Sequence, residues 1–107
     1  MRVLLDECLP TQLRRSLPGH DIRSARYMKW TGQRNGALLT LMQAHGFEVL
    51  VTVDQSLRHQ QNLAAAGVAV VVIIAVSNRY PDLAPYAPAV LAALAGIKPG
   101  DVVEVGL

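Results

Sequence analysis

The sequence predicts an α/β protein, a three-layer α/β/α sandwich around a mainly parallel, five-stranded sheet. Short aliphatic runs alternate with segments of helical periodicity along the 107 residues. Two of the runs, residues 48–52 and 68–76, are apolar almost throughout, which is typical of strands covered on both faces. Because a helix that joins parallel strands must cross back over the sheet, we expect helices on both faces.

The first half of the chain predicts two strands, each followed by a helix. Residues 2–5 form the first strand, and leucines then recur every fourth residue from Leu9 to Leu17, between a proline at position 10 and a Pro-Gly stop. Residues 21–25 give a weaker second strand. The second helix begins near Asn35, ends at Gly46, and carries its apolar face on Leu38, Leu39, Leu41 and Met42.

The second half predicts three more strands and two more helices. Residues 48–52 form the third strand, a helix follows from about Ser56 to Ala66, and residues 68–76 form the most buried strand. Three prolines at positions 81, 85 and 88 precede a last helix that ends at Gly96, and residues 101–105 form the final strand. We find no repeat, linker or low-complexity segment, so residues 1–107 are expected to form a single domain.

Composition excludes several classes of protein. A net charge of +2 and a pI near 9.0 are too weakly basic for a dedicated nucleic-acid coat protein. The single cysteine, Cys8, excludes an intrachain disulfide and fits a reducing compartment, and we expect it to be a structural thiol. The longest apolar run is far shorter than the roughly 20 residues of a bilayer span, and an acid at position 6 leaves no room for a signal peptide's apolar core. We therefore expect a cytoplasmic protein without membrane contact.

Acidic residues follow two of the predicted strands. Ligands of parallel sheets bind beyond the carboxyl ends of the strands, near the switch in strand order. With a strand order near 2-1-3-4-5, Asp6 and Asp54 would face one another there, with Glu7 beside them. Carboxylates that repel one another attract a hard cation, so Asp6 and Asp54 are candidate ligands for Mg²⁺ or Mn²⁺, and Glu7 is a third catalytic candidate. Such a metal activates water against a phosphodiester.

The same acids also have a structural interpretation. Asp54 and Asp6 each lie a few residues before a predicted helix, where an aspartate can cap the helix N-terminus. Glu7 is equally compatible with a solvated surface residue. The sequence leaves both interpretations open.

Two further segments are candidates for binding nucleic acid. Ser77, Asn78 and Arg79 follow the fourth strand and can bind phosphate, although the same residues are also ordinary turn formers. Arg58, in the third helix, is a further phosphate-binding candidate.

The loop of residues 23–34 combines basic and aromatic side chains. Lys29 and Arg34 are its candidate contacts to single-stranded nucleic acid, beside Arg26, Tyr27 and Trp30. The alternative is a solvated loop with Trp30 packed inward.

Five segments resemble the bacterial PIN-like proteins known as toxin components of toxin–antitoxin pairs. They are LLDECLP, WTGQRNGALL, VLVTVDQSL with HQQNL, VVVIIAVSNRYPDL and KPGDVVEV. The resemblance spans nearly the whole chain and implies a PIN-type sandwich, a Mg²⁺- or Mn²⁺-dependent ribonuclease that hydrolyses RNA phosphodiesters, and a cognate antitoxin protein that blocks the site. Asp6 matches the first acid of the family, Glu7 the second letter of its D-E pair, and Asp54 the acid of its T-x-D motif.

The chain also departs from that family. PIN nucleases usually gather three or four acids, but residues 35–37 are Asn, Gly and Ala where related sequences carry one, and Ser56 stands where another often follows the T-x-D motif. A catalytically inactive PIN-like binding module therefore remains an alternative to the ribonuclease. A phosphoacceptor receiver domain fits less well, because Lys98 precedes the last strand, whereas the receiver lysine follows it. The alanine-rich last helix offers a face for a homodimer.

Overall fold

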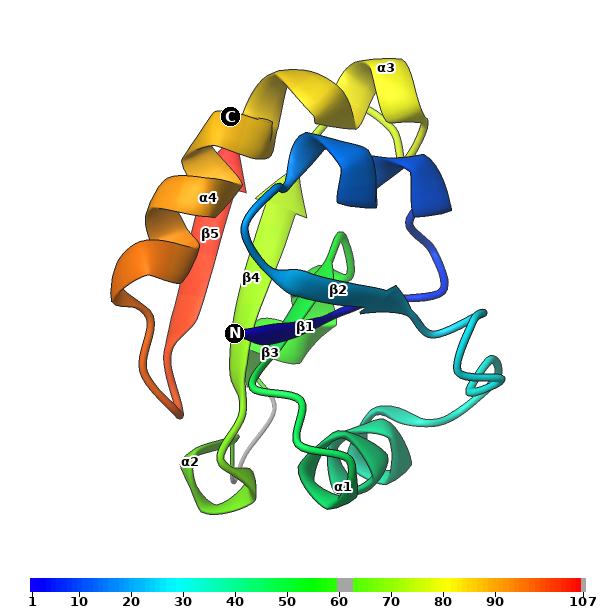
Figure 1. The fold of residues 1–107 in the computed structure, drawn as a ribbon, viewed down its shortest axis with the longest axis vertical. Coiled ribbons are helices and arrows are strands. Elements are labelled where there is room, and N and C mark those ends of the chain that lie inside the picture. The colour runs from blue at the N-terminus through cyan, green and yellow to red at the C-terminus, as the bar shows by residue number, and fades with distance from the viewer. Residues whose placement is uncertain (60–62, 107) are drawn as a thin grey trace.

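The protein folds around a five-stranded, all-parallel sheet in the order β2-β1-β3-β4-β5 (Figure 1). The computed structural model describes residues 1–59 and 63–106. Its strands are β1 (Arg2–Leu5), β2 (Asp21–Ser24), β3 (Val49–Thr52), β4 (Ala69–Ile74) and β5 (Val102–Gly106). The parallel sheet and the strand order expected from the sequence are both confirmed.

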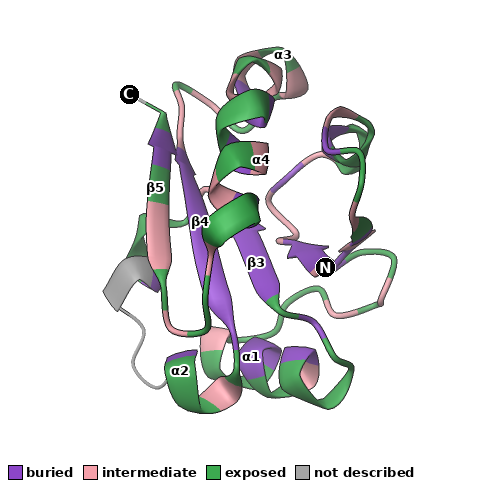
Figure 2. Cartoon of the chain, turned by 60° about the vertical axis from the view of Figure 1, so that its left-hand side comes forward, coloured by how far each residue is buried: buried purple, intermediate pink, exposed green. Residues whose placement is uncertain are grey.

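Helices cover both faces of the sheet, and successive strand residues point to opposite faces. In β1, Val3 and Leu5 belong to one buried cluster and Leu4 to the other. The first face carries η1 (Thr11–Ser16), α3 (Tyr80–Leu83), η3 (Ala84–Tyr86) and α4 (Ala87–Gly96); the second carries α1 (Asn35–Ala44), η2 (Gln55–His59) and α2 (Leu63–Ala66). Strands β3 and β4 are buried along nearly their whole length (Figure 2). The predicted α/β/α sandwich is therefore present.

Two predicted helices differ in kind from the expectation. The leucine segment after β1 forms a short 3₁₀ helix, η1, between Pro10 and the Pro-Gly stop. The single helix expected from Ser56 to Ala66 is wrong: the described parts are the 3₁₀ helix η2 and the one-turn α2. Residues 60–62 of the HQQNL segment lie outside the described part of the chain.

The approach to the last helix is segmented by proline. Prolines occupy the first or second position of α3, η3 and α4 in turn, where the missing N–H is tolerated. Within the described ranges, no helix is both long and apolar enough to cross a membrane.

The strand order creates a switch point between β1 and β3. From β1 the chain moves outward to β2 on one side, and β3, β4 and β5 then extend the sheet on the other. The pairing continues one residue past β1, since the Asp6 N–H donates to the Val51 carbonyl at 2.9 Å. Asp6 is therefore held at the carboxyl end of the strands, where ligands of such folds bind.

Candidate functional site

Asp6 is a half-buried carboxylate that, among the described residues, accepts hydrogen bonds from neutral donors. Its Oδ1 accepts the N–H of Glu7 at 2.8 Å, and its Oδ2 accepts the hydroxyl of Thr52 at 2.7 Å. It does not cap the helix that follows, because Pro10 occupies the N-cap position of η1 and no side chain bonds there. The capping interpretation of Asp6 is therefore wrong.

Thr52 connects the two strand ends. It is the last residue of β3, it is wholly buried, and its hydroxyl donates to Asp6 Oδ2 while accepting the N–H of Asp54 at 3.0 Å. One buried hydroxyl thus ties the Asp6 carboxylate to the main chain at Asp54. Sequence reasoning did not single out Thr52, although a polar residue that ends an apolar strand was the available signal.

Asp54 does have the predicted capping role. Its Oδ1 accepts both the N–H and the hydroxyl of Ser56, at 3.0 and 2.7 Å, and this Asx-turn begins η2. Ser56 therefore stands in the place of the expected additional acid as a donor to Asp54. The side chain of Asp54 is exposed at the surface beyond β3.

Glu7 fixes the basic loop to the acidic strand end. Its Oε1 accepts the N–H of Gly32 at 3.0 Å, so the half-buried Glu7 ties residues 25–34 to the end of β1. This contact gives Glu7 a positioning role beside Asp6.

The three carboxylates Asp6, Glu7 and Asp54 have no cationic partner in the part of the chain that the structure describes. The ion pairs found there join Arg2 and Arg23 to Asp21, at the opposite end of the sheet. The nearby Cys8 responds to this environment: burial raises the pKa of its thiol, and the negative charge of Asp6 adds to the rise. Cys8 is therefore a neutral thiol at neutral pH, as a structural role requires.

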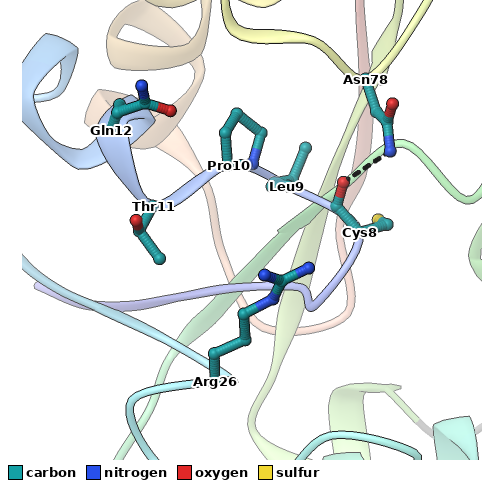
Figure 3. Close-up of a pocket in the computed structure, with 7 residues that line it drawn as sticks. All are labelled: Cys8, Leu9, Pro10, Thr11, Gln12, Arg26 and Asn78. Atoms are coloured by element: carbon teal, nitrogen blue, oxygen red, sulfur yellow. Dashed lines mark hydrogen bonds between the residues drawn. The ribbon is translucent and has the colours of Figure 1, made fainter.

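Of the three phosphate-binding candidates after β4, only Asn78 is hydrogen-bonded to the segment after β1 in the described part of the chain. The side-chain amide of Asn78 donates to the Cys8 carbonyl at 2.9 Å and joins the ends of β4 and β1 (Figure 3). The Ser77 hydroxyl instead donates to Asp82 and accepts the N–H of Arg79 at 3.0 Å, which begins α3. Turn formation is thus the interpretation that holds for Ser77, while Arg79 is an exposed N-cap.

The other nucleic-acid candidates are divided between surface and core. Lys29 and Arg34 are exposed. Trp30 packs inward and makes edge-to-face contacts with the rings of His45 and Phe47. The ring centroids are 4.9 Å apart for His45 and 5.7 Å apart for Phe47. Arg58 lies in η2, and its side chain is outside the described part.

A hollow of about 320 Å³ opens beside the acidic strand end (Figure 3). Its lining comprises residues 8–12, Arg26 and Asn78. Sequence reasoning named Arg26 only as one member of the basic loop, since its place in the hollow depends on contacts between segments far apart in the chain.

The arrangement of these residues has to carry the functional argument. Comparison with protein-family models, curated proteins and solved structures finds no match to this chain. Among residues 1–59 and 63–106, no group of three or more His, Cys, Asp or Glu side chains is placed to hold a metal ion, which argues against a closed zinc-type cage. Mg²⁺, however, is commonly held by one or two carboxylates, waters and substrate phosphates. Asp6 and Asp54 are carboxylates of the kind that such a site uses.

Proposed function

We propose that the protein is a PIN-like ribonuclease of the toxin type, dependent on Mg²⁺ or Mn²⁺ held by Asp6 and Asp54. One observation carries the proposal. The two aspartates follow β1 and β3, the strands that flank the switch point, and the buried hydroxyl of Thr52 binds both residues. The PIN-like resemblance supports the same two positions.

Each residue of the site then has a physical role. A bound divalent cation supplies an activated water and neutralises charge on the leaving oxygen. Thr52 holds the Asp6 carboxylate in one orientation, as hydrogen bonds behind metal ligands generally do. Glu7 positions the basic loop, and Asn78 positions the turn after β4. Arg79, Arg58, Lys29 and Arg34 are proposed to attract the RNA phosphates.

A cognate antitoxin is the proposed protein partner. A protein that covers the carboxyl end of the sheet would block both aspartates at once, because they lie at the same edge. We propose a cytoplasmic setting for both partners, in keeping with an RNA substrate.

An inactive PIN-like binding module is the second candidate, and the composition of the site favours it. The first turn of α1 contains no acid, and Ser56 replaces another, so the described site offers fewer carboxylates than an ordinary PIN nuclease. A module of this kind would keep the fold and the partner surface but would not cleave RNA.

Cleavage of a labelled single-stranded RNA, with Mg²⁺ or Mn²⁺ and with EDTA, separates the two candidates. Asp6→Asn is compared with the wild type and with the control Asp101→Asn, which removes a carboxylate at the turn before β5, at the opposite end of the sheet. We expect metal-dependent cleavage by the wild type and the control, and a loss of roughly 10²–10³-fold in Asp6→Asn. Cleavage that survives in Asp6→Asn contradicts the mechanism, and no cleavage by any form indicates the module.

A further inference from the structure

Two hollows adjoin along the outer side of η1. One is the hollow beside the acidic strand end, of about 320 Å³, and the other, of about 380 Å³, is lined by Thr11, Gln12, Arg14 and Arg15. Thr11 and Gln12 line both. Together they form one surface, the η1 groove, which runs from Cys8, two residues after Asp6, to Arg15.

The η1 groove has an uncompensated positive charge. Arg14, Arg15 and Arg26 are exposed, and in the described ranges none of them forms an ion pair. The lining residues of both hollows include no acid. Charges of this kind attract phosphate groups and release counterions when they bind them.

Arg26 and Asn78 flank the end of the groove that lies nearest the acids. Figure 3 shows the Arg26 guanidinium pointing toward the segment of residues 8–12, while Asn78 reaches the same segment from the β4 side and donates to the Cys8 carbonyl. A guanidinium presents a planar set of donors that matches two oxygens of one phosphate. This end of the groove is therefore suited to hold a phosphodiester, at a point that begins two residues after Asp6 in the chain.

The volumes of the two hollows can be compared with the size of a nucleotide. Their volumes, about 320 and 380 Å³, lie at the low end of the roughly 300–1,000 Å³ of sites that take small ligands. Each hollow is large enough for a single nucleotide unit. We propose that the η1 groove binds the backbone of single-stranded RNA through Arg14, Arg15 and Arg26 and leads one phosphodiester to Asp6. This inference rests on the proposed ribonuclease function.

Binding is measured apart from cleavage, by fluorescence anisotropy of a short labelled oligouridine in EDTA over a series of salt concentrations. Arg14→Ala, Arg15→Ala and Arg26→Ala are compared with Lys98→Ala, which removes one exposed positive charge at the other end of the sheet. We expect each arginine variant to raise Kd about fivefold to tenfold and to reduce the slope of log K against log salt by about 0.7. Lys98→Ala should change Kd by less than about twofold. Thermal melting confirms that each variant is folded.

The outcomes separate this inference from the ribonuclease proposal. Equal Kd values for Arg26→Ala and Lys98→Ala, or tighter binding of a duplex of the same length, would overturn the groove assignment. Asp6→Asn should bind the oligouridine at least as tightly as the wild type. Arginine-dependent binding without any cleavage would keep the groove and remove the ribonuclease. Cleavage that needs Asp6 but not Arg26 would keep the ribonuclease proposal and reject the groove.

Discussion

Acids at the two ends of the parallel sheet differ in the partners that they contact. At the amino-terminal end, Asp21 Oδ2 lies 3.3 Å from Arg2 Nε, and Asp21 Oδ1 lies 3.1 Å from Arg23 Nε. The Arg2 guanidinium lies over the Phe47 ring, 4.3 Å from its centre. At the carboxyl end, Asp6 and Asp54 accept hydrogen bonds only from neutral donors among the described residues.

This difference is consistent with the proposed cation site at the carboxyl end of the sheet. A half-buried carboxylate without a cationic partner among the described residues, such as Asp6, contributes little to folding, because its desolvation opposes the folded state. Asp21 is paired within the chain, whereas two other acids at the amino-terminal end, Glu48 and Asp101, accept main-chain N–H groups. We propose that the acids at the carboxyl end bind a cation that comes from solution.

Removing one carboxylate charge at each end of the sheet should give the largest difference in the rate of RNA cleavage. Asn caps helices as well as Asp does, so Asp54→Asn should keep the turn at η2 and lose only the charge. We expect RNA cleavage to fall roughly 10²–10³-fold in Asp54→Asn, and by less than about twofold in Asp21→Asn. The initial rates of cleavage measure both. Full activity of Asp54→Asn would mean that Asp54 is a cap and nothing more.

Thr52 links the two acids, so its hydroxyl should matter more to stability than any ion pair at the other end. In Thr52→Val the Asp6 Oδ2 and the Asp54 N–H lose their shared partner, at a cost of about 1–3 kcal/mol in the free energy of unfolding. Thr52→Ser keeps the hydroxyl and loses one buried methyl, about 1 kcal/mol. Urea denaturation compares the two. A Thr52→Val variant as stable as Thr52→Ser would show that the hydroxyl is not the link.

The amino-terminal ion pairs should contribute less. The side chains of Arg2, Arg23 and Asp21 are 39%, 38% and 46% exposed, so solvent and salt screen their attraction. We expect Asp21→Asn to lower the free energy of unfolding by less than about 1 kcal/mol, and by still less at high salt. Urea denaturation at low and high salt tests this. A loss as large as that of Thr52→Val would invert the proposed contrast between the two ends.

The smallest effect should appear at Cys8. The raised pKa leaves little thiolate at neutral pH, so alkylation by iodoacetamide should be slow and should accelerate as pH rises. Asp6→Asn removes a negative charge that opposes thiolate formation, so it should lower the pKa and speed alkylation a few-fold at fixed pH. Asp101→Asn is the matched control. An unchanged rate in Asp6→Asn would show that the Asp6 charge does not reach the thiol.

The sheet was predictable because its signals are local. Strands such as β3 and β4 are apolar runs with little competing periodicity, and glycines such as Gly46 and Gly67, both with positive φ, mark the ends of the segments before them. The helix type after β1 was not predictable from leucine spacing, because α and 3₁₀ segments of that length bury similar faces.

The candidate site was predictable only in part. The rule that parallel strands end at one edge places Asp6 and Asp54 together without any knowledge of contacts. Thr52 and Arg26 escaped prediction because their roles depend on neighbours distant in sequence: the hydrogen bond from Thr52 to Asp6 spans 46 residues. Trp30 and Ser77 had two interpretations each, and tertiary packing against Phe47 and the start of α3 decided between them.

The central claim is that Asp6 and Asp54 together hold a divalent cation. Isothermal titration of Mn²⁺ into the wild type, the Asp6→Asn/Asp54→Asn double variant and the Asp101→Asn control tests it without a choice of substrate. The account predicts Mn²⁺ binding by the wild type and by Asp101→Asn that the double variant loses. Equal binding by the double variant, or no binding by the wild type with or without a non-cleavable oligonucleotide, would contradict it.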